Sequence, residues 1–166
     1  LSLLVGRHSF NARIFYNGTF CDANRFTEDG ISGQLHVVRA GPVDFIHDDG
    51  AVTHVTEPSL LLFPRPLPHS FVTDPVRGAD MVCAHLVFEG GAANPIAAAL
   101  PPAVCLPLAA VGGAAPVLAL LFEEAFEQRC GRAALVERLF EVVMIQILRQ
   151  LMESGGIRGG MLSGLA

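Results

Sequence analysis

The sequence predicts a mainly β fold, a small barrel or sandwich, followed by two antiparallel helices. In roughly the first hundred residues, short runs rich in β-branched and aromatic residues alternate with turn signals about every 8–12 residues, which is typical of β-sandwiches and barrels. Residues 89–115 are instead rich in Gly, Ala and Pro and predict a connector with one last strand. Residues 116–129 and 132–153 then have the apolar spacing of helices.

The strands are expected in a definite order, with turn residues between them. They are residues 12–19, 34–39, 43–47, 51–56, 59–63, 70–73, 81–88 and 103–108. The run from Ser59 to Phe63 is almost continuously apolar, as in a fully buried strand. Asn17-Gly18 and Asp48-Asp49-Gly50 are turn signals. The prolines between Pro64 and Pro68 fix φ and end the strand before them.

The helical part has recognisable ends. Pro116 stands where a first helical turn begins, and Gly131 fits a C-cap after the shorter helix. The longer helix, 132–153, is apolar on two sides, which predicts two partners, the barrel and a second subunit. The sequence therefore divides into a barrel (1–112), a helical dimerisation hairpin (113–153) and a glycine-rich linker (154–166).

Composition and charge exclude several classes of function. The formal net charge is −5 with no run of Lys or Arg, so this chain is not expected to bind nucleic acid by itself. No apolar run reaches the roughly 18–20 residues that span a bilayer, so no membrane partner is expected. The four cysteines form no CxxC motif, which favours a cytoplasmic setting. The missing initiator Met and the glycine-rich end suggest a piece of a longer protein.

A series of short segments occurs in a characteristic order over nearly the whole chain. They are Gly18-Thr19-Phe20-Cys21; Leu35-His36-Val37-Val38 before Gly41; Leu61-Leu62-Phe63-Pro64-Arg65 with His69; Val82-Cys83 with Phe88; Asn94-Pro95-Ile96; and Leu100-Pro101-Pro102, followed by the two helices. In this order and spacing the chain resembles the N-terminal cupin-like domain of one branch of AraC-type transcription regulators. It departs from that branch in having Ala84 after Cys83, where Gly is frequent.

The resemblance implies both a fold and a role. The fold would be a cupin-like β-barrel (a double-stranded β-helix) followed by the two helices. The role would be that of a sensory or dimerisation domain. A DNA-binding domain would follow residue 166, and the chain would form a homodimer through its C-terminal helices. A small molecule is one candidate effector.

The usual metal site of cupins is expected to be broken. Pro64 and His69 fit the second cupin motif, but Gln34 takes the position of the usual Glu, and the paired histidines before it are absent. A cupin-type oxygenase is therefore disfavoured. A small cupin-type metalloenzyme is the alternative to the regulator, since fold alone assigns no reaction.

A different metal site can be built from cysteines and histidines. Cys83 and His85 stand two residues apart on a strand and share a face. If that face and His36 point into the barrel, Cys21, His36, Cys83 and His85 would make a Cys₂His₂ set suited to zinc. His69 is either a further ligand or a hydrogen-bonding partner of the proline corner. The alternatives are buried cysteines that act as small apolar residues, or a redox pair of Cys21 and Cys83.

The remaining titratable residues carry weaker expectations. His47 and His54 flank the Asp48-Asp49-Gly50 turn and are expected to be solvated. Cys105 is expected in the core, and Cys130 is expected to be exposed at a helix end. The sequence contains no GxSxG, GxGxxG or P-loop motif. The signal that the domain senses would be metal occupancy, thiol oxidation or a bound small molecule. No enzymatic activity is expected.

Overall fold

The computed structural model describes residue 1, residues 6–26 and residues 29–155, and nine strands run through these residues. The strands are β1 (Phe10–Phe20), β2 (Ala23–Phe26), β3 (Gly33–Ala40), β4 (Val43–Ile46), β5 (Val52–Val55), β6 (Ser59–Phe63), β7 (His69–Thr73), β8 (Ala79–Phe88) and β9 (Val104–Pro107). The helices are α2 (Pro95–Ala99), α3 (Ala115–Phe126) and α4 (Arg132–Glu153), with short 3₁₀ turns at Gly91–Ala93 and Leu108–Ala110.

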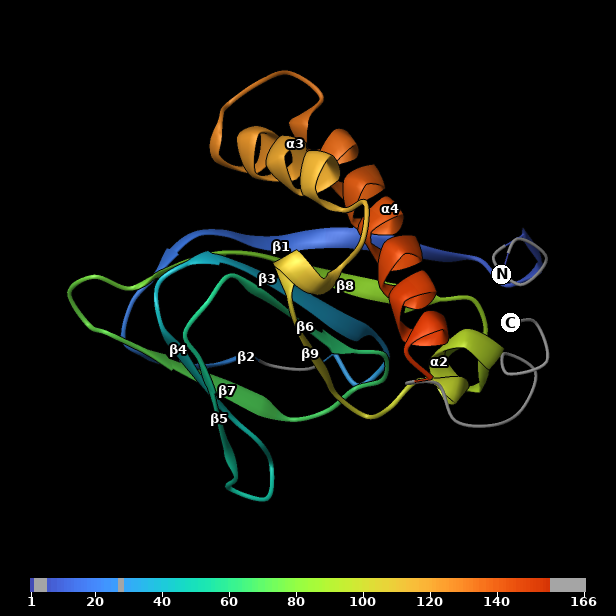
Figure 1. Cartoon of the computed structure of the whole chain (residues 1–166), viewed down its shortest axis with the longest axis horizontal. Coiled ribbons are helices and arrows are strands. Elements are labelled where there is room, and N and C mark those ends of the chain that lie inside the picture. Colours follow the sequence, from blue (N-terminus) through green and yellow to red (C-terminus); the bar gives the residue numbers. More distant parts are fainter. Residues whose placement is uncertain (2–5, 27–28, 156–166) are drawn as a thin grey trace.

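The strands form two antiparallel sheets that face each other (Figure 1). One sheet has five strands in the order β1-β8-β3-β6-β9, and the other has four in the order β2-β7-β4-β5. Strands distant in sequence lie side by side, as when β3 pairs with both β6 and β8. The expected mainly β fold with C-terminal helices is therefore confirmed.

Alternation along the central strands separates two apolar clusters. In β3, Leu35 and Val37 point to the outer face of the five-stranded sheet, whereas Val38 points between the sheets. Because β3 lies in the middle of the sheet with both faces covered, its residues are buried from Gly33 to Val38. The inner cluster, rich in phenylalanine, is the barrel interior and surrounds the site described below.

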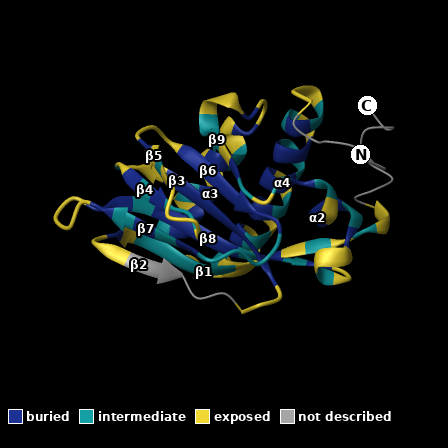
Figure 2. Cartoon of the chain, turned by 90° about the horizontal axis from the view of Figure 1, so that it is seen from below, coloured by how far each residue is buried: buried dark blue, intermediate teal, exposed yellow. Residues whose placement is uncertain are grey.

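Helices α3 and α4 lie together on the outer face of the five-stranded sheet (Figure 1). Phe140, Val143 and Ile147 of α4 are completely buried in the same cluster as Leu35 and Val37. Figure 2 shows this buried layer in dark blue beneath exposed loops. The helices and the barrel thus share one core. None of the described helices is long and apolar enough to cross a membrane.

Several local predictions were wrong or incomplete. Asn17 and Gly18 lie inside β1 and pair with Val82 and Met81, so they do not form a turn. Gly131, with φ +78°, is the N-cap of α4, because α3 has already ended at Phe126.

Strand β2 and helix α2 were not anticipated. Helix α2 has a clear start signal: the side chain of Asn94 accepts a hydrogen bond from the Ile96 N–H, and Pro95 occupies the first turn. Arg65 from the proline corner donates to the carbonyl oxygens of Ala97 and Leu100 and so anchors the end of α2.

Replacement of Gly78 is expected to destabilise the barrel strongly. Its φ is +63°, and a Cβ would lie 2.5 Å from the Phe20 carbonyl oxygen and 2.7 Å from the Cys21 Sγ. We expect Gly78→Ala to lower the free energy of unfolding by about 2–3 kcal/mol, measured by urea denaturation. The matched control is Gly50→Ala, since Gly50 has φ +82° but open space around it, and should cost about 1 kcal/mol. Equal losses in the two variants would contradict the close approach at Gly78.

Candidate functional site

Two histidines meet at the centre of the barrel, one from each sheet. His36 lies in β3, completely buried, and His69 is the first residue of β7. Their Nε2 atoms are 3.0 Å apart, and Gln34 Oε1 lies 3.1 Å from the Nε2 of His36. Strand alternation explains why Gln34 and His36 share the inner face of β3.

The hydrogen bonds assign the tautomers of this histidine pair. His69 Nδ1 lies 2.7 Å from the carbonyl oxygen of Leu67, which can only accept, so Nδ1 carries the proton. In the neutral ring the Nε2 of His69 is then an acceptor. His36 must therefore donate from its Nε2, toward both His69 and Gln34. The bond to Leu67 also fulfils the expectation that His69 holds the proline corner.

Phenylalanine rings enclose this pair. Phe63 stacks on His69 with ring centroids 4.2 Å apart, and Phe71 meets the edge of His36 at 4.9 Å. Burial lowers the pKa of His36 well below its usual range, and the neighbouring His69 and His85 lower it further. Burial likewise lowers the pKa of His69, although its bond to Leu67 opposes the shift. Both rings are therefore neutral at pH 7.

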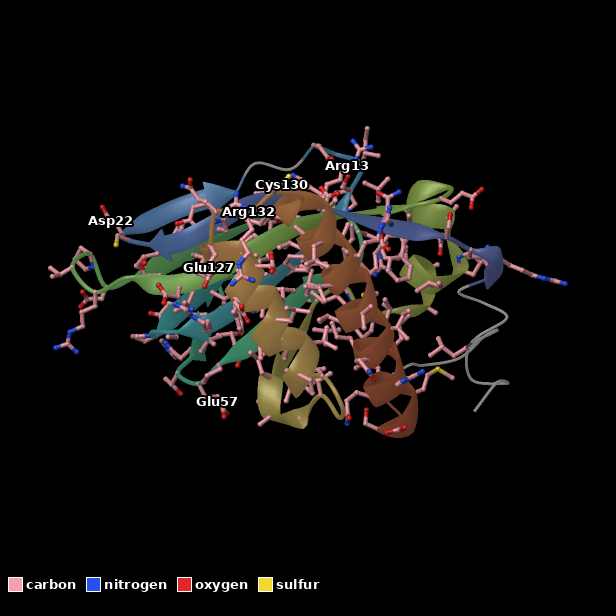
Figure 3. The ribbon with its side chains drawn as sticks, turned by 90° about the horizontal axis from the view of Figure 1, so that it is seen from above. Arg13, Asp22, Glu57, Glu127, Cys130 and Arg132 are labelled. Carbon is pink, nitrogen blue, oxygen red and sulfur yellow. The ribbon has the colours of Figure 1, made fainter. Side chains whose placement is uncertain are left out.

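The proposed zinc ligands are only partly brought together. Cys83 pairs with His36 across β3 and β8 and points into the barrel, and His85 is close enough to affect the pKa of His36. Cys21 lies beyond the Phe20–Ala79 pair that ends β1. Figure 3 shows Asp22, the next residue, at the opposite end of β1 from Arg13, which pairs with His85.

The register places Cys21 far from the other three residues. Its backbone lies beyond Ala79, four residues along β8 from Cys83, a separation of about 13 Å or more at 3.3 Å per residue. A disulfide needs Cα atoms within about 7 Å, so Cys21 and Cys83 cannot form one in this conformation. Among residues 1, 6–26 and 29–155, no three His, Cys, Asp or Glu side chains lie close enough to hold a metal ion.

The metal site usual in cupins does not fit these residues either. The facing Nε2 atoms of His36 and His69 are engaged with each other, and Gln34 offers a neutral oxygen in place of a carboxylate. A divalent cation bound by hard oxygen ligands would lack the charged ligand that it requires. No reaction step is therefore assigned to a metal here.

The accessibility of the thiols is directly measurable. We expect an aromatic disulfide reagent to modify the exposed Cys21 and Cys130 quickly and the buried Cys83 only on unfolding. Burial shields the Cys83 thiol from the reagent. It also raises the pKa of Cys83 well above its usual range, so little of the reactive thiolate forms. Peptide mass spectrometry after short exposure distinguishes the sites. Rapid labelling of Cys83 in the folded chain would contradict the buried position.

Two hollows occur at one end of the barrel, and both are lined by His47. The first, of about 90 Å³, opens where β4 and β5 face β6 and β9, and its walls include Phe45, Phe63 and Cys105. The second, of about 150 Å³, lies beside His69 and is bordered by Asp48, Pro68 and Ser70. We call the first hollow the seam pocket and the second the end depression.

Two residues that line the seam pocket lie in other surroundings than the sequence predicted. His47, expected to be solvated, is half-buried: its ring lies 4.1 Å from that of Phe45, and its Nε2 is 2.8 Å from Thr53 Oγ1. Cys105, expected in the core, is exposed along β9 and lines the pocket. His54, by contrast, is exposed as expected and pairs with Asp44 at 2.7 Å.

In addition to the shared apolar core, two polar side chains among the described residues connect the barrel to the helices. Asn17 donates from Nδ2 to the carbonyl oxygen of Ala125 near the end of α3, at 2.8 Å. Arg39, at the end of β3, lies over the ring of Phe126 at 4.2 Å and forms an ion pair with Asp80 at 2.6 Å. These contacts connect strands that line the barrel interior to one end of the helical pair.

The turn between α3 and α4 is held by arginines. Figure 3 shows Arg132 beside Glu127 and Cys130 at this turn. Arg132 donates to the Ala125 carbonyl oxygen at 3.4 Å and to that of Glu127 at 3.5 Å. Arg129 pairs with Glu127 at 2.6 Å. Cys130, expected to be exposed at a helix end before Gly131, is exposed, but it lies in the turn between α3 and α4.

The fold agrees with the comparisons with known proteins. A family model described as Cupin matches residues 1–153, so the chain belongs to the cupin family. The comparison with curated protein sequences finds no significant match. The expected cupin-like fold is thus confirmed.

Solved structures of ToxT from Vibrio cholerae are similar in fold. ToxT of strain SCE256 bound to an unsaturated fatty acid gives a TM-score of 0.52 at 10% identity, over 91% of this chain and 56% of that chain. ToxT of strain O395 bound to (E)-4-(8-methylnaphthalen-1-yl)but-3-enoic acid gives 0.51 at 8% identity, over 91% and 58%. This chain therefore spans a little over half the length of the ToxT chains that it matches.

Proposed function

We propose that this chain is the sensory and dimerisation domain of an AraC-type transcription regulator and that a small molecule binds in its barrel. The sequence resemblance and membership of the cupin family support this proposal. The observation that carries it is the His36–His69 pair within phenylalanine side chains, with the seam pocket reaching Phe63 and the end depression reaching His69. A mostly apolar interior with a few converging polar groups is the usual composition of a small-molecule site.

The bound molecules of the ToxT structures support an organic effector. Those proteins were solved with an unsaturated fatty acid and with a naphthalenyl butenoic acid. Both are small organic molecules with a large apolar part. The fold is shared at a TM-score just above 0.5, so the likeness supports a class of effector and no particular compound.

A signal would pass from the barrel to the helices through β1. Phe15 lies within a register shift of β1, and it packs with the following Tyr16 against the interior cluster. The next residue, Asn17, bonds to the end of α3. A shift of β1 on effector binding would therefore displace α3. In the full protein this movement would reposition a DNA-binding domain outside this chain, in the cytoplasm where the DNA lies.

The helical pair is the proposed dimer surface. Leu135 and Val142 lie seven residues apart on α4 and are 40% and 39% exposed, and Leu120 of α3 is 40% exposed. Large apolar side chains gathered on one helix pair are typical of a surface covered by a partner. We expect the chain to sediment as a dimer and Val142→Glu to sediment as a monomer with unchanged circular dichroism. A monomeric wild-type chain at tens of micromolar would contradict this surface.

Bound zinc, and with it the alternative of a cupin-type metalloenzyme, stays a prediction. His36, Cys83 and His85 lie on the interior face of two neighbouring strands, which favours it. The distant Cys21, and the lack of three such side chains close enough for a metal ion among the described residues, do not favour it. Formation of a disulfide between Cys21 and Cys83 would require β1 to move, because the two residues are far apart.

Native mass spectrometry tests the sensor against the metalloenzyme. The protein is purified from its natural host without chelator, and its native mass is compared with its denatured mass. We expect an organic molecule that is lost on denaturation, and elemental analysis without stoichiometric metal. About one metal ion per chain, with no organic molecule bound, would favour the metalloenzyme instead.

A further inference from the structure

We infer that the effector enters the seam pocket past His47 and that it is a small, uncharged aromatic compound with one hydroxyl-type head, and not a carboxylate. This inference deepens the proposed function and rests on it. The residues that line the two hollows, the volumes of the hollows and the charge of their lining support it.

The seam pocket exists because the two sheets part at one edge. Strand β5 ends one sheet and β9 ends the other, and the two do not pair. Phe45 and Thr53 line the pocket from the four-stranded sheet, and Leu61 and Phe63 line it from the five-stranded sheet. Interior side chains can thus be reached through this edge, which a closed barrel would cover.

Among the described residues that line the two hollows, His47 alone borders both the seam pocket and the end depression. It follows the last residue of β4, and its ring is held by a hydrogen bond to Thr53 Oγ1 and by its edge contact with Phe45. Rotation of this ring requires breaking one bond to a half-buried hydroxyl. The movement would join the two hollows into one site that reaches His69.

The size of the hollows limits the ligand. An apolar cavity of about 150 Å³ accommodates a benzene-sized molecule. The seam pocket, with its phenylalanine walls, has only about 90 Å³, so the aromatic body also needs the space that rotation of the His47 ring would open toward the end depression of about 150 Å³. The joined hollows fit a ligand of about ten non-hydrogen atoms, with an aromatic body against Phe45 and Phe63 and a polar head toward Asp48 and Ser70.

The charge of the lining residues determines which polar head group the ligand can carry. The described lining residues include no Lys or Arg, and Asp48 places a carboxylate at the end depression. Both ring nitrogens of His69 are engaged, Nδ1 with the Leu67 carbonyl oxygen and Nε2 with the Nε2 of His36, so neither is available to pair with an anion. A carboxylate ligand would be desolvated here without a countercharge. A hydroxyl could donate to Asp48 and accept from Ser70.

Two matched probes test this assignment. Binding of 2-phenylethanol and of phenylacetate, which share the aromatic body, is measured at pH 7.5 by chemical-shift perturbation and calorimetry. We expect 2-phenylethanol to bind at least tenfold more tightly. Ala103→Leu, which fills the seam pocket, should abolish this binding, whereas the exposed Ala110→Leu should not. Both variants should unfold at temperatures close to that of the wild type.

Each outcome decides the question. Equal binding of the two probes, tighter binding of phenylacetate, or binding that survives Ala103→Leu would overturn the inference. So would the absence of binding by either probe. The proposed function would survive these results if the natural protein carried a different organic molecule in the native mass spectrum. It would fail separately if a metal were bound instead.

Discussion

Acidification from pH 7 to pH 5 is expected to destabilise the folded chain by about 2 kcal/mol or more. Burial holds the pKa values of His36 and His69 below their usual range, whereas in the unfolded chain they titrate near 6.5. Below about pH 6.5 the unfolded state therefore binds protons that the folded state does not. Stability is complete above pH 6.5 and is lost at up to about 1.4 kcal/mol per pH unit for each histidine.

Urea denaturation between pH 7.5 and 5 measures this dependence. Aspartate and glutamate in the unfolded chain titrate mostly below about pH 4.5, outside this window. We expect His69→Gln to reduce the pH dependence. The matched control is His54→Gln, since His54 is exposed on β5, away from the barrel interior. An equal free energy of unfolding at pH 7.5 and at pH 5 would show that the two histidines are not buried in their neutral form.

Truncation of Phe140 is expected to cost about 3–5 kcal/mol of unfolding free energy. Phe140 is completely buried where α4 packs on the five-stranded sheet, in the cluster that also contains Leu35 and Val37. Removing its ring leaves a cavity between helix and barrel. Because one core joins both parts, Phe140→Ala should destabilise β3 as well as α4.

Hydrogen exchange locates this loss. In Phe140→Ala, amides of α4 and of β3 should exchange faster together, as expected for one cooperative unit. The control Val142→Ala lies on the exposed face of α4 and should cost less than about 0.5 kcal/mol, at a concentration where the chain is monomeric. Faster exchange in α4 alone would mean that the helices are a separate unit and could not transmit a signal from the barrel.

Much of the fold could be predicted from local sequence. The run from Ser59 to Phe63 forms β6 with the expected limits, and the helix expected at 132–153 is α4. Both signals are strong because they depend on continuous or periodic apolar residues. Strand β2 was missed because Ala23–Phe26 carries no such pattern and is positioned by pairing with β7.

The candidate site was less predictable, because it depends on register and on strands distant in sequence. From the sequence, His36 and Cys83 would converge only if both faced the barrel interior, and the register of β3 and β8 pairs them. The distance of Cys21 follows from the length of β1. The position of His47 at the seam depends on β5 and β9 being edge strands of different sheets. Turn residues alone indicated a solvated histidine, and no local signal revealed its contact with Phe45.

The central claim is that this chain senses a small molecule on behalf of a DNA-binding domain. Chromatin immunoprecipitation of the natural full-length protein tests it most directly, with transcript levels measured in the same cells. The account predicts occupancy of a few discrete genomic sites and changed transcription beside them, and no such occupancy by residues 1–166 alone. A full-length protein that occupies no genomic site and carries one metal ion per chain would contradict it.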